Sequence, residues 1–332
     1  MQRGEGSVRH LGRTSMLWLN NRLKAPPVNG PWIGPEYLAN VDRRRPDAVS
    51  VIDGVPVLTV DELPSLVQAV GYLKFHTEGL TYLRGQTHLY DSMLPSLFRG
   101  ARPGNQRAAQ IARLVATTSP WTCSHSGHKA GDCIERLSGA GHNEIRLLSG
   151  GVPRYAAEPL LQHYGVKTRW IDVVDNLWIA LWFACHSFGG VEGYRHPVRR
   201  TLHDGGDPYV YVITVGLPGA RKTVAPGLVR VPDRGRIVDL REAVPSFYLR
   251  PHAQHGLLVR PHDDDYFNLR LGALRIPLPD ALDWLGSSLL LSPFALFPPP
   301  SVDVGYRRMI RASAHVPARE AVGQIDIYGP GY

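Results

Sequence analysis

Several common catalytic signatures are absent from this chain, and each absence excludes a class of protein. The sequence has no G-x-G-x-x-G after a strand, no G-x-x-x-x-G-K and no H-E-x-x-H. These patterns mark Rossmann dinucleotide-binding units, P-loop NTPases and zinc metalloproteases. We therefore expect none of these three classes.

Long apolar runs and cysteines are also scarce. No stretch approaches the roughly 20 continuous apolar residues that cross a bilayer, and the first residues lack the apolar core of a signal peptide. The three cysteines, Cys123, Cys133 and Cys185, form no even disulfide framework. We expect a cytoplasmic protein in a reducing compartment, without a membrane partner.

The charge balance is basic. Lys and Arg number 37 against 29 Asp and Glu, which gives a formal charge of +8. Such a balance favours encounters with anions such as nucleotides or nucleic acids. Basic residues cluster at Arg43–Arg45, Arg199–Arg200, Arg221–Lys222, Arg230, Arg234 and Arg236. Together they indicate a nucleic-acid target, although ordinary solvated surface explains any one cluster.

Composition divides the chain into three parts. Residues 1–50, with turn-forming PP, NG and GP pairs, read as an irregular N-terminal arm. Residues 51–300 form one main domain, interrupted at about 100–150 by a polar, Gly-rich insertion. Residues 301–332 form a C-terminal extension.

The main domain mixes helical and strand patterns without regular alternation, which predicts an α+β fold rather than a doubly wound parallel sheet. Helices are expected after Asp61, over 154–163 despite Pro159, and over 177–184 with Asp175 as the cap. The expected strands are 80–83, 168–173, 209–215, 257–260 and 271–276.

Two runs place polar residues beside strongly apolar elements. YLRGQ contributes Arg84 and Gln86, and LLQHYGVKTRWIDVVDNLWIALWFAC contributes Gln162, His163, Thr168, Arg169 and Asp172. With YLRGQTHLYDSMLPSLFRG, RPHAQHGLLV and ALFPPP, these runs resemble the bacterial and phage FRG-domain family. Family members usually carry Leu and Trp where this chain has Trp170 and Val173. The family occurs beside toxin and phage-defence genes, which implies such a role and a possible antitoxin partner.

A looser resemblance is to the NAD-dependent ADP-ribosyltransferases of the arginine-type class. Tyr82, Arg84 and Gly85 resemble their first motif, residues 168–183 the second, and residues 253–259 the third. This resemblance implies an ADP-ribosyltransferase-like mixed sheet core with flanking helices, in a single main domain, and NAD as a substrate. It departs at the third motif, where Gln254 stands in place of the usual Glu.

The resemblance assigns a role to each residue. The Arg84 guanidinium would bind NAD phosphates, and Gly85 would let the backbone approach the cofactor. Asp172 would stabilise the oxocarbenium-like ribose, Gln254 would orient the acceptor, and His163 could move a proton. The remaining cofactor-binding candidates are Tyr82, Gln86, Gln162, Thr168 and Arg169.

Structural roles are the alternatives. Arg84 could be a buried arginine paired with Asp172, and Arg169 and Asp172 could satisfy each other. Cys123, His125, His128 and Cys133 are zinc-ligand types, but their spacing matches no usual zinc site, so we expect a solvated loop and no metal.

We therefore expect an NAD-dependent ADP-ribosyltransferase that modifies a macromolecule, with DNA or RNA as the candidate acceptor, in a toxin or phage-defence role. Two alternatives remain open. One is a non-catalytic module that binds a nucleotide or nucleic acid, which the missing Glu favours. The other is a nuclease-like toxin, although no carboxylate cluster of the kind that metal-dependent cleavage uses is evident.

Overall fold

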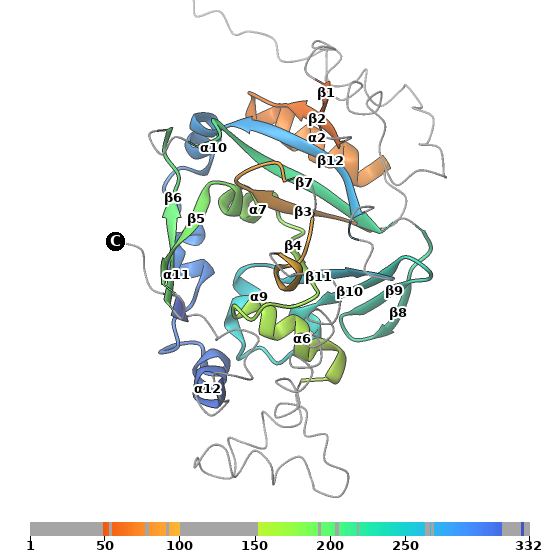
Figure 1. Ribbon diagram of the computed structural model, residues 1–332, viewed down its shortest axis with the longest axis vertical. Coiled ribbons are helices and arrows are strands. Elements are labelled where there is room, and N and C mark those ends of the chain that lie inside the picture. Colours follow the sequence, from red (N-terminus) through yellow and green to blue (C-terminus); the bar gives the residue numbers. More distant parts are fainter. Residues whose placement is uncertain are drawn as a thin grey trace, which may run out of the picture.

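The computed structural model describes residues 327–328 and residues 49–313, the latter apart from 53–54, 77–79, 91–92, 100–151, 192–193, 203–205, 218, 263–265 and 267–268. The described residues form a mixed α and β structure with three sheets (Figure 1). The α+β class is thus confirmed at the level of element content. The ADP-ribosyltransferase-like arrangement of the core stays a prediction.

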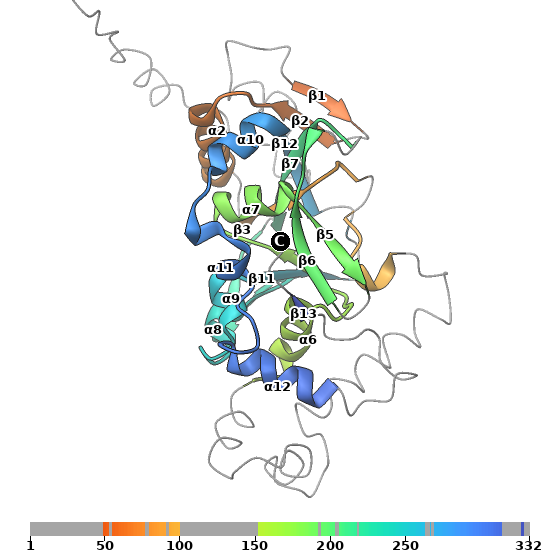
Figure 2. The same ribbon diagram turned by 90° about the vertical axis from the view of Figure 1, so that its left-hand side faces the viewer.

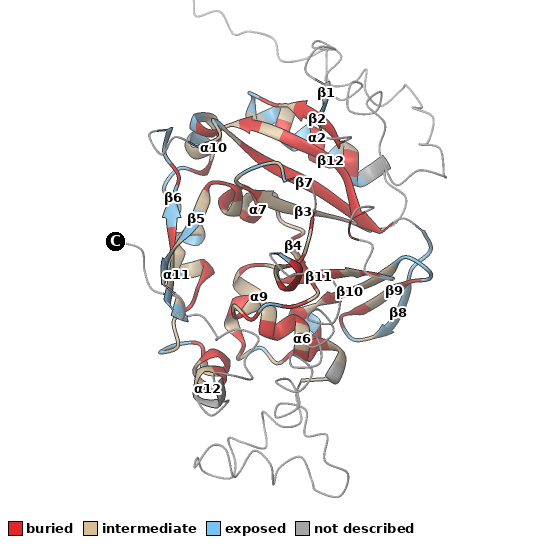
Figure 3. Ribbon diagram, viewed as in Figure 1, coloured by how far each residue is buried: buried red, intermediate tan, exposed pale blue. Residues whose placement is uncertain are grey.

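The first sheet has the order β1-β2-β12-β7-β3. Its strands are β1 (Val49–Ile52), β2 (Val55–Thr59), β12 (Arg270–Pro277), β7 (Tyr209–Leu217) and β3 (Leu80–Gln86). Neighbours are antiparallel except β2 and β12. The apolar run of β7 has neighbours at both edges and is buried almost throughout, as Figure 3 shows. Such a run is typical of a central strand covered on both faces.

The second sheet has the order β4-β11-β10-β9-β8, and all its neighbours are antiparallel. Its strands are β4 (Ile171–Val173), β11 (Leu257–Pro261), β10 (Gly235–Asp239), β9 (Leu228–Val231) and β8 (Lys222–Ala225). Edge strand β3 meets this sheet beside β4, where Leu83 and Val174 exchange two backbone hydrogen bonds of 2.8 Å. The two polar runs of the sequence therefore lie side by side.

The third sheet has the order β13-β6-β5, with β5 (His186–Val191), β6 (Tyr194–Arg199) and β13 (Ile327–Tyr328). In Figure 2 the β5 and β6 ribbon faces the viewer and runs from the level of β2 down to that of α6. The helices are α2 (Leu63–His76), α6 (Arg154–His163), α7 (Leu177–Ala184), α8 (Leu240–Ala243), α9 (Leu249–Ala253), α10 (Leu278–Leu285), α11 (Pro293–Leu296) and α12 (Val304–Ser313), with 3-10 turns η2 (Ser96–Phe98) and η6 (Leu289–Leu291). Among the described residues, no helix has both the length and the apolar character of a membrane span.

Helix α7 has the predicted bounds but a different cap. The Asn176 side chain accepts hydrogen bonds from the backbone N–H groups of Trp178 and Ile179. The prediction that Asp175 caps this helix is wrong, because its carboxylate is bound to Arg241 and His255 instead. The nearly all-apolar helix is buried against β3 and β7.

Helix α6 also has the predicted bounds, with Pro159 inside it. It ends before Gly165, whose φ of +102° is a conformation that glycine adopts readily. The strand expected from Thr168 begins only at Ile171. The Thr168 hydroxyl accepts a hydrogen bond from the Trp170 N–H at 3.1 Å, which forms a local turn in place of a strand.

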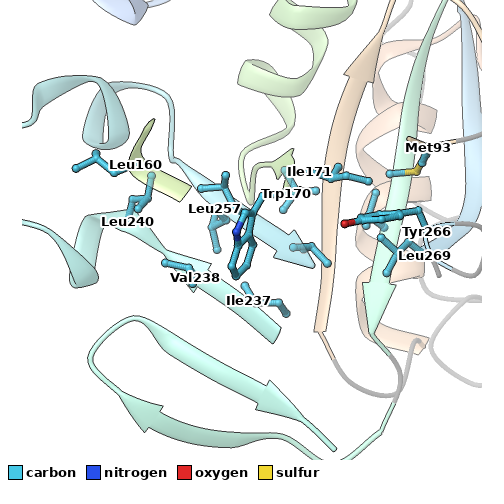
Figure 4. Close-up of a cluster of buried hydrophobic side chains, with 14 of the residues drawn as sticks. Met93, Leu160, Trp170, Ile171, Ile237, Val238, Leu240, Leu257, Tyr266 and Leu269 are labelled. Carbon is cyan, nitrogen blue, oxygen red and sulfur yellow. The ribbon is translucent and has the colours of Figure 1, made fainter. Parts of the chain in front are cut away.

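Two apolar clusters hold these layers together. One packs α2, α7 and α10 onto one face of the first sheet. The other fills the space between the second sheet, α6 and the opposite face of the first sheet. Figure 4 shows this second cluster, in which Trp170 lies among Val238, Leu240 and Leu257. Strand β4, with the polar residues next to it, is thus held in a rigid apolar setting.

Candidate functional site

A cavity of about 450 Å³ opens where the three sheets meet. Its walls come from β3, β4, α6, α7 and β5, and from Gln254, Phe297 and Tyr328. Sizes of this order are typical of small-molecule pockets. Seven predicted site residues line it: Arg84, Gly85, Gln86, Gln162, His163, Asp172 and Gln254.

The Asp172 carboxylate is held by two neighbours from the end of α6. The Gln162 amide nitrogen donates to its Oδ2 at 2.6 Å, and the His163 Nδ1 lies 3.7 Å from its Oδ1. The Thr168 hydroxyl donates to the Gln162 carbonyl oxygen, so Thr168 fixes which way that amide points. The Asp172 side chain remains 45% exposed, which leaves it accessible from the cavity.

The electrostatics keep this carboxylate ionised. Burial acts to raise the pKa of Asp172, but hydrogen bonding and charge from His163, the Arg84 charge and the Gln162 hydrogen bond outweigh burial and hold that pKa below its ordinary value. An ionised carboxylate at neutral pH can stabilise developing positive charge or accept a proton.

Arg84 lies beside Asp172 without forming an ion pair with its carboxylate. Its Nη1 donates to the Asp172 backbone carbonyl at 2.6 Å. A guanidinium has five N–H donors, and within the described part of the chain this is the one hydrogen bond that the Arg84 side chain donates. Burial lowers the pKa of Arg84, although a guanidinium of this kind stays charged. The alternative in which the Arg84 side chain pairs with the Asp172 carboxylate is therefore not observed, because the backbone carbonyl is the acceptor.

Gln86 supplies a further polar group. Its side chain is only 6% exposed and lines the cavity, and it makes no hydrogen bond to any other described residue. Buried amides are normally satisfied. The Gln86 amide is therefore available to a ligand.

His163 and Gln254 are more constrained. The His163 side chain is 5% exposed, and its buried Nε2 has no hydrogen-bond partner in the described structure. A Cβ at Gly256 would come within 2.7 Å of that nitrogen, so the ring packs directly on this glycine. The Gln254 amide nitrogen donates to the Leu296 carbonyl at 2.7 Å, which leaves its carbonyl oxygen for a ligand. Of the two ring nitrogens of His163, Nδ1 faces Asp172 and Nε2 packs on Gly256.

Gly85 lines the cavity for a packing reason. A Cβ at this position would lie 1.8 Å from the Ala180 carbonyl oxygen and 2.7 Å from the Ala184 nitrogen. The glycine thus lets α7 approach β3. This close contact with a helix, rather than with a cofactor, explains the missing side chain.

Three predicted residues lie outside the cavity lining. Tyr82 packs against the cluster between the sheets, where burial first, and then Asp239 and Asp175, raise its pKa to about 12. Thr168 is fully buried and acts through Gln162. Arg169 forms a two-bond pair with Glu158, at 2.9 and 2.6 Å, rather than with Asp172. The alternative in which Arg169 and Asp172 satisfy each other is therefore not observed.

Aromatic residues that sequence reasoning left out form another wall. Phe183, Phe188, Phe297 and Tyr328 line the cavity, and Tyr328 stacks on Phe297 with ring centroids 4.7 Å apart. Tyr90 and Arg99, which also line the cavity, belong to the YLRGQTHLYDSMLPSLFRG run, so their place in that run was the available signal.

No metal site is evident in the part of the chain that the structure describes, where no group of three or more His, Cys, Asp or Glu residues gathers. The candidate zinc ligands Cys123, His125, His128 and Cys133 lie outside the described residues. Cys185 is described, and burial raises its pKa to about 12, as expected of a small buried side chain.

Comparison with known families gives one match. Residues 80–189 match the FRG domain, which is about a third of the 332-residue chain. This segment contains both polar runs, from Arg84 to Asp172, and so agrees with the resemblance read from the sequence. No curated protein and no solved structure matches the chain.

Proposed function

We propose that the cavity binds a dinucleotide, NAD, and that the protein transfers its ADP-ribose to a macromolecule. One observation carries the proposal: a guanidinium and a carboxylate line the same cavity, yet they do not pair with each other. Holding two such charges near the interior costs free energy unless a ligand engages them. A substrate with anionic phosphates and a carbon that becomes cationic would engage both the Arg84 guanidinium and the Asp172 carboxylate.

The chemistry assigns each group a task. Arg84 would bind pyrophosphate oxygens through its unused N–H donors. The aromatic wall would receive a flat ring, and Gln86 would hydrogen-bond the carboxamide or ribose. As the bond between ribose C1′ and the nicotinamide nitrogen breaks, its electron pair leaves with nicotinamide and Asp172 stabilises the positive charge at C1′. An acceptor oxygen or nitrogen then bonds to C1′ and loses a proton.

The test is incubation with NAD carrying a labelled adenylate phosphate, in the presence of DNA, RNA or cell lysate. Released nicotinamide and a labelled acceptor are the expected products. Arg84→Ala should abolish both, because the phosphate anchor is lost. Arg195→Ala is the matched control, since it removes an arginine of β6 outside the cavity lining. Equal nicotinamide release from the two variants would overturn the assignment.

A binding module is the second candidate function. Asp172 is the single carboxylate among the described residues that line the cavity, whereas the resembling transferases bring a Glu in their third motif. NAD binding by calorimetry, without nicotinamide release for any acceptor, would favour this module. Cleavage of RNA or DNA without NAD would favour the nuclease-like alternative. Growth arrest on expression would support a toxin role.

A further inference from the structure

A row of basic residues crosses the second sheet. Lys222 of β8 is directly opposite Arg230 of β9, Arg230 is opposite Arg236 of β10, and Arg236 is opposite Arg260 of β11. Directly opposed residues on neighbouring strands point to the same face, about 5 Å apart at the backbone. The four residues, which we name the basic row, thus form a continuous line of positive charge across four strands. The basic clusters of the sequence together indicate a nucleic-acid target, but they do not reveal this alignment across the strands.

The basic row is open to solvent over its outer half. Lys222 and Arg230 are exposed, and Arg236 and Arg260 are partly buried. Figure 3 shows the mostly exposed strand β8, which ends the sheet. The row is therefore accessible to a large partner.

Little negative charge offsets three of the four residues of this row. Lys222, Arg230 and Arg236 make no ion pair within the part of the chain described here. The nearest carboxylate of α6, Glu158, is already bound by Arg169. Burial, followed by the charge of Arg260, lowers the pKa of Arg236, with Arg169 and Arg230 acting in the same direction and Glu158 against it. Like charges placed directly opposite each other on neighbouring strands destabilise a sheet.

The basic row ends beside the cavity. The next row on the same sheet face runs Leu228, Val238, Leu258 and Asp172, since each is paired with the next across β9, β10, β11 and β4. Arg260 lies two residues from Leu258 along β11, a separation of about 7 Å. Trp170, two residues before Asp172, lies under Arg236, with the guanidinium 5.2 Å from the ring centroid. The charged line therefore leads from the free edge of the sheet toward the strand that carries Asp172.

We propose that the basic row binds the phosphodiester backbone of a nucleic acid and directs it toward the cavity. A polyanion relieves the repulsion along the row, and arginine forks match phosphate oxygens. An anionic membrane fits less well, because Val224 is the one large apolar side chain exposed on the described residues of β8 to β11. Under this proposal, the nucleic acid is the acceptor of the proposed ADP-ribose transfer. Binding of nucleic acid to the basic row does not depend on that transfer, whereas delivery of the acceptor to Asp172 does.

The experiment measures binding without NAD, so that it does not depend on catalysis. Fluorescence anisotropy with labelled 20-nucleotide RNA and DNA, single and double stranded, gives affinity between 50 and 300 mM salt. For a single strand, four phosphate contacts predict a slope of log K against log salt of about −2.8. The double variant Lys222→Glu with Arg230→Glu should reduce the magnitude of this slope by about 1.4, and it should weaken binding more than about tenfold at low salt.

The matched control is Arg195→Glu with Arg199→Glu, which makes the same charge change on β6 of the third sheet. If the two double variants bind nucleic acid equally, net charge rather than the basic row explains binding, and the proposal fails. It also fails if vesicles with anionic lipid bind the unmodified protein more tightly than nucleic acid does. Hydrolysis of NAD, in which water is the acceptor and nicotinamide is released, tests the proposed function separately because it needs no nucleic acid.

Discussion

The carboxylate of Asp172 has one oxygen bound by an amide and the other near an imidazole, and it still faces the cavity. If it stabilises the reacting ribose, Asp172→Asn should lower nicotinamide release by about 10²- to 10³-fold, the usual effect of losing one electrostatic group. NAD affinity should change only a few-fold, because Arg84 remains. Turnover assays with calorimetry separate the two effects. Asp283→Asn, an exposed change on α10, is the control, and equal turnover in both variants would exclude a catalytic Asp172.

The same carboxylate links stability to pH. Its pKa is lower in the folded protein than in the unfolded chain, so ionised Asp172 stabilises the fold above the unfolded value, near 3.9. That contribution is lost as pH falls through the lower folded pKa. Urea unfolding at pH 7, 5 and 3 should therefore show the advantage of the natural protein over Asp172→Asn shrinking only at the most acidic point. An advantage that fades between pH 7 and 5 would contradict a lowered pKa.

Sequence reasoning located the polar half of the cavity because Arg84, Gln162 and Asp172 each interrupt an apolar run, where a charge or amide needs a reason. It did not anticipate that Thr168 acts through the neighbouring Gln162 amide, since a hydrogen bond between side chains leaves no periodic signal in the sequence. The aromatic wall could not be predicted either. Phe188 and Tyr328 are 140 positions apart in the sequence, and only the pairing of β13 with β6 brings them together.

At the scale of the element, the close packing of α7 on β3 depends on one glycine, Gly85. Gly85→Ala should destabilise the fold by about 1–3 kcal/mol or more, because the new methyl group meets the α7 backbone rather than a movable side chain. Gly71→Ala in α2 is the matched control, since its Cβ would meet nothing within 4 Å, and it should stabilise by about 0.5–1 kcal/mol. Urea denaturation measures both. A harmless Gly85→Ala would mean that the helix does not approach the strand this closely.

The bounds of α7 followed from its composition, whereas its cap did not. Asp175 and Asn176 are both good cap residues, and only the tertiary partners decide between them. Arg241 and His255 come from α8 and from the turn after α9, and they bind the Asp175 carboxylate at 2.9 and 2.7 Å. The sheet order was equally hidden, because pairing β2 with β12 joins residues more than 200 positions apart.

At the scale of the whole molecule, described residues of the segment 301–332 pack into the main domain. Asp303 is fully buried and accepts hydrogen bonds from the Tyr164 hydroxyl at 2.7 Å and from the backbone of Leu249, Arg250 and Tyr306. The buried Arg250 guanidinium lies 4.4 Å from the Tyr306 ring centroid and 4.5 Å from that of Tyr328. It also donates to the His163 carbonyl at 3.1 Å, so these contacts reach the cavity.

Deleting residues 301–332 should therefore unfold the region around α6 and α9, because Arg250 would lose two aromatic partners and several buried donors would lose their acceptor. Each buried donor left without its acceptor costs about 1–3 kcal/mol. Asp303→Ala should reproduce most of this loss in the full-length chain, whereas Asp280→Ala on α10 should not. Thermal unfolding compares the three proteins, and hydrogen exchange at α6 locates the change. If the truncated chain unfolds at the same temperature as the full-length protein, the main domain ends before Asp303.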